Sequence, residues 1–189
     1  AAAMIAALLV MVLQIARARG CSPVIGIAGS PEKCRLVEEL GADAAIDYKR
    51  EDVAARIGEL FPDGLDIYFD NVGGEILEAA LEHLAPRARV VLCGSISEYT
   101  RKEPFGPRNY TRLRRGDSDL RGFFVYNHLD SFPTAEEEMA GWIREGRLRA
   151  LVDISEGFET MPEALMGLYT GSNRGKRIVR VTPGEDVIY

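Results

Sequence analysis

Short apolar runs alternate with longer amphipathic stretches along the first half of the chain. The apolar runs, which are typical of buried strands, are "SPVIGIAGS", "AAIDYK", "LDIYFDNV" and "ARVVLCGSIS". The stretches between them carry apolar residues at helical spacing and end at Gly or Pro; they are "PEKCRLVEELG", "EDVAARIGELFP" and "GGEILEAALEHLAP". Strands that alternate with helices of this length predict βαβ units and a mostly parallel sheet.

The second half of the chain is less regular. A Pro- and Gly-bearing loop, "EYTRKEPFGPRNY", precedes a further predicted strand, "LRGFFVYNH". Two amphipathic helices and a closing strand are then expected, at "FPTAEEEMAGWIREGRL", "MPEALMGLYTG" and "GKRIVRV". The chain has no internal repeat and no low-complexity linker, and 189 residues favour one domain. We therefore expect a single α/β domain over residues 1–189, with helix and strand elements at its C-terminal end.

The first 20 residues, "AAAMIAALLVMVLQIARARG", are apolar almost throughout up to Ala16. A membrane-spanning helix needs about 20 apolar residues, whereas this run is interrupted at Gln14 and becomes basic at Arg17. A signal peptide carries its positive charge before the apolar stretch, and here the charge follows it. We expect a buried helix within a soluble domain, with a membrane-tethered domain as the alternative.

Composition and charge are those of an ordinary soluble globular protein, with 47% hydrophobic and 28% charged residues. A net charge of -6 argues against a nucleic acid partner, because neutralising phosphates needs an excess of Lys and Arg on one face. The segment "PRNYTRLRR" is locally basic through Arg108, Arg112, Arg114 and Arg115. We interpret it as a solvated surface run, with an anion site as the alternative.

Three cysteines, Cys21, Cys34 and Cys93, form no C-x-x-C pair and leave an odd count. That pattern fits the reduced thiols of a cytoplasmic protein better than a disulfide framework or a zinc site. The two histidines, His83 and His128, belong to no apparent ligand cluster. We therefore expect no bound metal.

Small or polar residues follow four consecutive predicted strands. They are Gly29 and Ser30 with Lys33, then Tyr48 and Lys49, then Asn71 with Gly73 and Gly74, then Gly94 and Ser95. In an open α/β sheet, ligands bind beyond the carboxyl ends of the strands. A flat dinucleotide that lies across this edge would need such residues.

The first of these strand ends bears on which dinucleotide is bound. A fold that selects NAD usually places Asp or Glu there to hold the adenosine ribose, whereas this chain offers Gly29 and Ser30, with Lys33 one helical turn further on. An ammonium at a helix N-terminus attracts a 2′-phosphate, which favours NADP. The alternative is an ordinary Ser-Pro helix start followed by an exposed lysine.

Taken together, these residues resemble the zinc-independent medium-chain dehydrogenase/reductases. The stretches that carry the resemblance are "GIAGSPEKCRLVEELGADAAIDYK", "DGLDIYFDNVGGEILEAALEHL", "RVVLCGSISEY", "GPRNY" and "RGFFVY". The branch is similar to the leukotriene/prostaglandin reductases and alkenal double-bond reductases, and the resemblance runs from about Ala1 to Val181. It implies a Rossmann-like, doubly wound fold that binds NADP.

The resemblance also assigns residues to the cofactor. It implies that Lys33 holds the 2′-phosphate, that Tyr48 packs near the adenosine ribose and that Asn71 reaches the cofactor. Residues implied around the nicotinamide end, together with one further family asparagine near the cofactor, are Cys93, Gly94, Ser95, Ile96, Phe123, Phe124, Val125 and Asn173.

Each of these residues has a structural alternative. Cys93 and Ile96 belong to residue types that are often buried in cores, Asn71 could be a turn residue, and both phenylalanines could be strand core. Tyr99 is the one candidate for catalysis, because a phenol there could donate to the oxygen on which negative charge develops. As a surface tyrosine it would have no role.

Two departures from the family pattern bear on activity. The positions that correspond to the Gly-rich turn are Ala6, Leu9 and Leu13, where the turn needs glycine for a tight bend and for approach to the pyrophosphate. The strand before that turn is expected to be missing. The N-terminal catalytic domain of the family is also expected to be missing.

The resulting hypothesis is an NADPH-dependent oxidoreductase, impaired in this chain. By resemblance, it adds hydride to the β-carbon of an α,β-unsaturated ketone or aldehyde, a small-molecule substrate. The alternative is a non-catalytic nucleotide-binding or dimerisation module derived from such a reductase. Partners are then the enone or enal and a second copy of the chain in a homodimer, with neither a nucleic acid nor a membrane.

Overall fold

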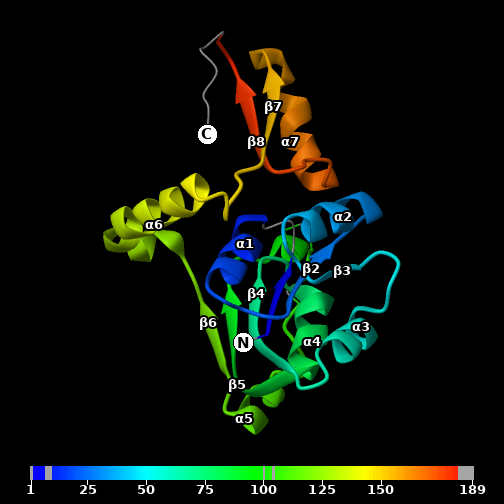
Figure 1. Cartoon of the computed structure of the whole chain (residues 1–189). Coiled ribbons are helices and arrows are strands. Elements are labelled where there is room, and N and C mark those ends of the chain that lie inside the picture. Colours follow the sequence, from blue (N-terminus) through cyan, green and yellow to red (C-terminus); the bar gives the residue numbers. More distant parts are fainter. Residues whose placement is uncertain (1, 7–9, 100, 104, 183–189) are drawn as a thin grey trace. The chain divides into compact units, whose positions relative to one another are not determined.

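A six-stranded parallel sheet forms the centre of the first part of the chain (Figure 1). The structure is a computed structural model that describes residues 2–6, 10–99, 101–103 and 105–182. The chain divides into two compact units, Ala1–Leu148 and Arg149–Tyr189. Whether both units form one dinucleotide-binding domain over residues 1–189 stays a prediction.

The strands of the first unit lie in the order β3-β2-β1-β4-β5-β6, and every neighbouring pair is parallel. This is the strand order of the doubly wound dinucleotide fold, with its switch point between β1 and β4. The strands are β1 (Ala3–Ala6), β2 (Val24–Ala28), β3 (Ala44–Asp47), β4 (Leu65–Asp70), β5 (Leu84–Leu92) and β6 (Asp119–Gly122). The predicted fold class is confirmed.

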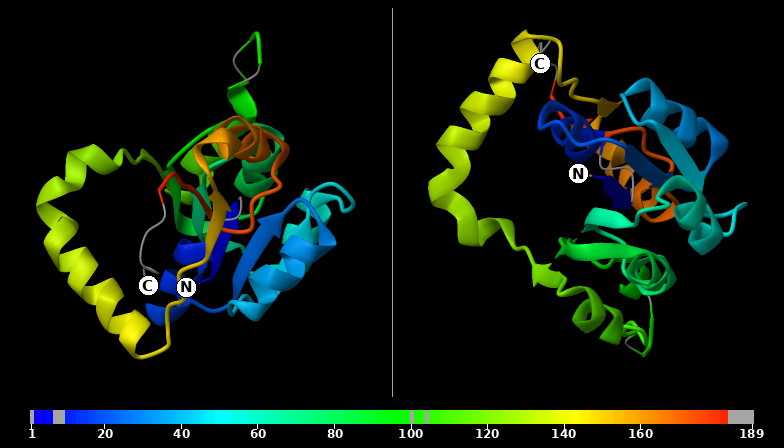
Figure 2. Two further views of the ribbon diagram at one scale, coloured as in Figure 1. Left: turned by 90° about the horizontal axis from the view of Figure 1, so that it is seen from above. Right: turned by 60° about the horizontal axis from the view of Figure 1, so that its bottom comes forward.

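Helices connect these strands, and Figure 2 gives two further views of them. They are α1 (Val10–Ala18), α2 (Pro31–Glu39), α3 (Val53–Leu60), α4 (Gly74–Glu82), α5 (Thr111–Gly116) and α6 (Phe132–Arg144). Two short 3-10 helices, η1 (Ile96–Glu98) and η2 (Val125–Ser131), follow β5 and β6. The helix at α5 was not predicted, and η2 replaces the second half of the strand that was predicted at "LRGFFVYNH".

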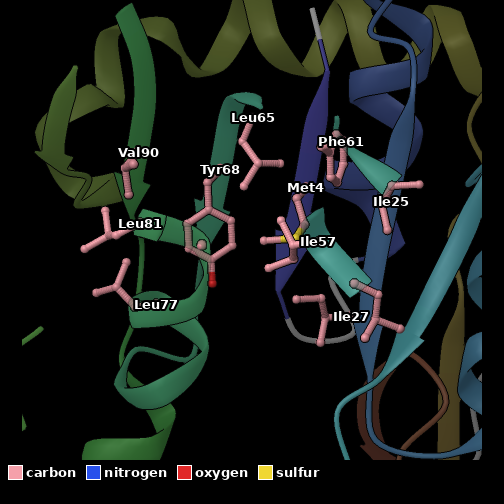
Figure 3. Packing of buried hydrophobic residues seen from close by; sticks show 12 residues of the cluster. Met4, Ile25, Ile27, Ile57, Phe61, Leu65, Tyr68, Leu77, Leu81 and Val90 are labelled. Carbon is pink, nitrogen blue, oxygen red and sulfur yellow. The ribbon is translucent and has the colours of Figure 1, made fainter. Parts of the chain in front are cut away.

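The two faces of the sheet are covered by different helices. On β2, Ile25 and Ile27 belong to the core cluster that includes Ile57 of α3 and Leu81 of α4, seen in Figure 3. Because side chains alternate along a strand, Gly26 points to the opposite face. There a Cβ on Gly26 would overlap Val37 of α2, so the glycine allows that helix to lie close to the strand.

The predicted absence of a first strand is wrong. Ala3–Ala6 forms β1, which pairs with β2 on one side and with β4 on the other. The run was interpreted as one helix because a short apolar stretch without a breaker does not distinguish strand from helix. The segment forms a strand because it pairs within the sheet, where Met4 is fully buried in the core between the neighbouring strands.

The second unit is a small βαβ arrangement. Its parallel strands β7 (Val152–Glu156) and β8 (Lys176–Arg180) are joined through η3 (Phe158–Thr160) and α7 (Met161–Thr170). The predicted helix and closing strand are confirmed, whereas β7 was not predicted. The unit leaves several large apolar side chains exposed, among them Phe158, Leu165, Met166 and Tyr169.

No helix among the described residues is long and apolar enough to cross a membrane. The predicted helix in the first 20 residues is shorter than expected, because α1 begins at Val10 and ends at Ala18.

Candidate functional site

The carboxyl ends of β2 to β5 bring the predicted site residues to one edge of the sheet. Parallel strands end on the same side, so the residues that follow them are neighbours although they are far apart in sequence. Backbone hydrogen bonds link these ends directly: Tyr48 N donates to Ala28 O at 3.0 Å, and Cys93 N donates to Asp70 O at 2.8 Å.

One end of this edge is a basic corner at the start of α2. Ser30 caps the helix, and its hydroxyl oxygen accepts from the backbone N–H of Lys33 at 3.3 Å. Burial lowers the pKa of Lys33, and the nearby positive charge of Lys49 lowers it further. The carboxylate of Glu32 acts in the opposite direction, so this corner holds Lys33 in the first turn of α2, Lys49 after β3 and one negative charge. An anion at the helix N-terminus would meet both ammonium groups.

Gly29 and Tyr48 fit together beside that corner. A Cβ on Gly29 would come within 2.7 Å of the Tyr48 ring, so glycine is required for the phenol to lie against this loop. The ring remains 45% exposed, and the Lys49 ammonium lies 5.9 Å from its centroid. Tyr48 therefore presents an accessible aromatic surface next to the two lysines.

A buried carboxylate shapes the loop after β4. Asp70 is fully buried, and its Oδ1 accepts from the Tyr68 hydroxyl at 3.0 Å, from Val72 N at 3.0 Å and from Gly73 N at 3.1 Å. Burial raises the pKa of Tyr68 well above its usual value, and the charge of Asp70 raises it further. The phenol therefore stays a hydrogen-bond donor, and the loop is held by a closed set of bonds.

Asn71 and the loop after β5 lie against each other. A Cβ on Gly94 would overlap Asn71 Oδ1 and would stand 3.1 Å from its Cγ. The backbone oxygen of Asn71 accepts from Ile96 N at 3.2 Å, and the Ser97 hydroxyl donates to Val72 O at 2.6 Å. These bonds join the loops after β4 and β5, and the Asn71 amide packs against Gly94 between them.

The remaining predicted residues of this loop face solvent to different degrees. Cys93 is exposed, and partial burial together with the charge of Asp70 raises the pKa of its thiol. Ile96 is 46% exposed and Tyr99 67% exposed, while a Cβ on Gly73 would lie 3.4 Å from the Cβ of Ser95. Ile96 is not a core residue, so the structural alternative given for it is wrong.

The residues after β6 continue the edge. Phe123 N donates to Leu92 O at 2.8 Å, which extends the sheet by one residue. The Phe123 ring stacks on His128 with centroids 4.9 Å apart, whereas Phe124 is 62% exposed and packs edge-on against Tyr126. Phe124 is therefore not strand core, and Val125 is exposed as well.

Asn173 lies in the second unit, apart in sequence from all the other candidates. Its side chain donates to Gly175 O at 2.9 Å, which closes the turn before β8. Within the second unit, Asn173 therefore has a local role in the turn before β8.

The Gly-rich turn is only partly described. Residues 7–9, which include Leu9, lie outside the described residues, and Ala6 ends β1. Leu13 is 2% exposed, and its Cδ1 would lie 3.5 Å from a Cβ on Gly26. Leu13 thus packs against the strand across from a glycine. Its side chain fills the interface between α1 and the sheet.

The basic segment "PRNYTRLRR" is a surface run, as predicted, because all four of its arginines are exposed. Arg108 forms a two-pronged pair with Glu78, and Arg112 pairs with Glu82. The carboxylates of α4 thus neutralise two of its four arginines. Among the described residues, no group of three or more His, Cys, Asp or Glu side chains could hold a metal ion.

Two residues of the site were missed from the sequence, Asp70 and Ser97. An Asp that precedes Asn and a Gly pair is a turn signal, and this signal could have identified Asp70. Ser97 carries no comparable pattern.

Comparisons with known proteins place these features in a family. The family model described as zinc-binding dehydrogenase matches residues 9–141. The (+)-pulegone reductase of Mentha piperita is 40% identical over 91% of this chain and 51% of its own length. The NADP(+)-dependent 2-alkenal reductase of Nicotiana tabacum is 38% identical over 91% of this chain and 50% of its own.

Solved structures agree with the sequence matches. CurA from Vibrio vulnificus in complex with NADPH superposes with a TM-score of 0.89 at 33% identity, over 97% of this chain and 57% of that one. The quinone oxidoreductase of Escherichia coli complexed with NADPH shares the fold, with a TM-score of 0.80 at 20% identity. The chain spans about half the length of the curated relatives it matches.

Proposed function

Because the chain belongs to the zinc-binding dehydrogenase family, in its double-bond reductase branch, we propose that it binds NADPH for the reduction of carbon–carbon double bonds. The resemblance drawn from the sequence motifs is confirmed by these matches. Two relatives are named as reductases of pulegone and of 2-alkenals, so the substrates proposed are α,β-unsaturated ketones and aldehydes.

The observation that carries the proposal is the basic corner at the start of α2. Lys33 lies in the first turn of α2, which Ser30 caps, and the charges of Lys49 and Glu32 act on it in opposite directions. A dianionic 2′-phosphate at this corner would gain charge-assisted hydrogen bonds from the two ammonium groups. NADH lacks that phosphate, so the corner favours NADPH.

The rest of the edge fits an extended dinucleotide. Tyr48 offers its exposed ring to the adenosine end, while the Asn71 amide, which packs against Gly94, is proposed to reach the cofactor further along the edge. Cys93, Ser95, Ile96, Phe123, Phe124 and Val125 continue towards the nicotinamide end. Asn173 remains a candidate cofactor residue by resemblance alone.

When bound, NADPH supplies the hydride that the β-carbon of the substrate accepts. Tyr99 is proposed to donate a hydrogen bond from its phenol to the substrate carbonyl oxygen, where negative charge develops. Its ring is 67% exposed after η1, which leaves it accessible to a substrate. A proton added at the α-carbon completes the reduction.

We also propose that the chemistry needs no zinc, that the protein is cytoplasmic and that it forms a homodimer. The described residues hold no metal-ligand group, and the three cysteines are unpaired thiols, as a reducing compartment requires. Strand β6 lies at the end of the sheet order, and its four residues are exposed. Such an edge can pair with a second copy. No observation favours a nucleic acid or a membrane as partner.

The exposed β6 edge also supports the second candidate, a non-catalytic nucleotide-binding or dimerisation module. Titration with NADPH, followed by the fluorescence of NADPH, tests cofactor binding. The proposed function predicts binding at micromolar concentration, and no change in fluorescence up to millimolar concentration would contradict it. Incubation of an enone with 4-deuterated NADPH then separates them. A reductase yields product with deuterium at the β-carbon, whereas a chain that binds NADPH but yields no such product is the module.

A further inference from the structure

A pocket of about 430 Å³ lies between the end of β6, η2 and the first turns of α6. Figure 2 shows α6 as the long helix that follows this segment. The volume of the pocket falls within the range of about 300–1,000 Å³ that small-molecule sites occupy. The lining residues are Phe123, Val125, His128, Ser131, Phe132, Ala135, Glu136 and Met139.

The lining is mostly apolar, and one face of α6 contributes half of its residues. Phe132, Ala135, Glu136 and Met139 recur at positions i, i+3, i+4 and i+7, which share one side of a helix. Opposite them, Phe123 stacks on His128 with an interplanar angle of 15°, so two flat rings form the other wall. Aromatic and aliphatic walls of this kind suit a compact hydrocarbon body.

The pocket adjoins the edge of the sheet. Phe123, which lines it, is held by the hydrogen bond of its backbone N–H to Leu92 O at 2.8 Å. Leu92 is followed directly by Cys93 and Gly94, the residues proposed for the nicotinamide end. The pocket thus begins next to the place where a reacting double bond would have to lie.

Charge around the pocket is one-sided. Residues 123–139 contain Asp130, Glu136, Glu137 and Glu138, and no Lys or Arg. Arg19, which directly follows α1, approaches from outside the segment, but it pairs with Glu138 at 2.6 Å, and Glu138 does not line the pocket. Glu136 does line it, so a ligand that carries a carboxylate would meet a like charge there.

We propose that this pocket binds the hydrocarbon body of small neutral substrates and discriminates against substrates that carry a carboxylate. This inference rests on the proposed function for the reaction, but the binding itself needs neither cofactor nor turnover. It narrows the substrate class: ring-sized enones and enals fit, whereas acidic long-chain enones are disfavoured by Glu136.

A matched pair of probes tests the inference, perillaldehyde and perillic acid, which share one ten-carbon skeleton and differ in charge. Methyl-¹³C labelling of the five methionines gives the readout, because Met139 lines the pocket while Met4 is buried in the core. The Met139 signal, identified by its loss in Met139→Leu, is expected to shift on titration with perillaldehyde. Perillic acid should bind at least about 10-fold more weakly.

Two variants locate the effect. Ala135→Phe fills the pocket and should weaken perillaldehyde binding by at least about 10-fold, while Glu136→Gln should narrow the gap between the two probes. Glu137→Gln is the matched control, since Glu137 has the same charge on the same helix but does not line the pocket. All three positions are exposed, so the variants are expected to fold.

A Met139 signal that does not move with perillaldehyde up to millimolar concentration would overturn the inference. So would equal affinity for perillic acid, or an Ala135→Phe variant that binds like the original chain. NADPH binding, measured separately, is expected to be unchanged in Glu136→Gln. If the original chain does not bind NADPH but its Met139 signal still shifts with perillaldehyde, the proposed function is refuted and the pocket assignment stays in place.

Discussion

The Asn71 carboxamide occupies the space where a side chain on Gly94 would begin. A Cβ there would overlap Oδ1 and stand 3.1 Å from Cγ, so the Asn71 amide can keep this position only because residue 94 is glycine. The backbone of the two loops is joined at the same place by the bond from Gly94 N to Asp70 O at 3.2 Å.

Gly94→Ala is therefore expected to push the Asn71 amide out of position. We predict a loss of NADPH affinity of about 10-fold, because one hydrogen bond to the cofactor and the close backbone approach are both disturbed. Isothermal titration measures the effect. Gly106→Ala is the control, since a Cβ at Gly106 meets nothing within 4 Å; equal affinities in both variants would contradict the role given to Asn71.

Asp70→Asn tests the buried carboxylate behind that loop. An amide offers an oxygen on one side only, so its NH₂ group would face a donor such as the backbone N–H of Gly73, which lies 3.1 Å from each carboxylate oxygen. We expect urea unfolding to show a loss of about 2–3 kcal/mol. The exposed Asp63→Asn should change stability by less than about 0.5 kcal/mol. A similarly small change in Asp70→Asn would refute the account of the loop.

The Glu78–Arg108 pair predicts a pH dependence. The two-pronged bond from Arg108 lowers the pKa of Glu78 to about 2. Because the folded pKa is depressed, the stabilisation is fully present above the unfolded value of about 4.3. It is lost as the pH falls through about 2.

Carboxyl ¹³C NMR measures this midpoint directly. Arg108→Ala should return the Glu78 midpoint towards its ordinary value, whereas Arg115→Ala, which removes an exposed arginine of α5, should leave it in place. A Glu78 midpoint in the ordinary range with Arg108 present would contradict the pairing.

The repeated strand–helix pattern allowed most of the first unit to be predicted from sequence. Residues such as Val24–Ala28 and Leu65–Asp70 are apolar runs bounded by turn residues, and they form the strands expected there. β1 could not be identified in the same way, because Ala3–Ala6 runs into α1 without a polar boundary. Only its pairing with β2 and β4 makes it a strand.

The site was predictable where strand ends and turn residues coincide. Asn71 and Gly94 follow neighbouring strands and lie against each other, and Lys33 lies in the first turn of the helix that follows β2. The function of Asp70 depends on burial and on bonds from three backbone or side-chain donors, which a linear pattern does not show. β7 was missed because "VDISE" has only two apolar residues, and in the structure three of its five side chains are partly buried and two are exposed.

The most direct test of the account compares NADPH and NADH binding in the original chain and in Lys33→Ala. The account predicts that the original chain binds NADPH more tightly than NADH. Lys33→Ala should weaken NADPH binding about 10- to 100-fold, as expected for a hydrogen bond to a charged group. The same variant should change NADH binding by less than about 2-fold. Equal losses for both cofactors, or no loss for NADPH, would contradict the assignment of Lys33 to the 2′-phosphate.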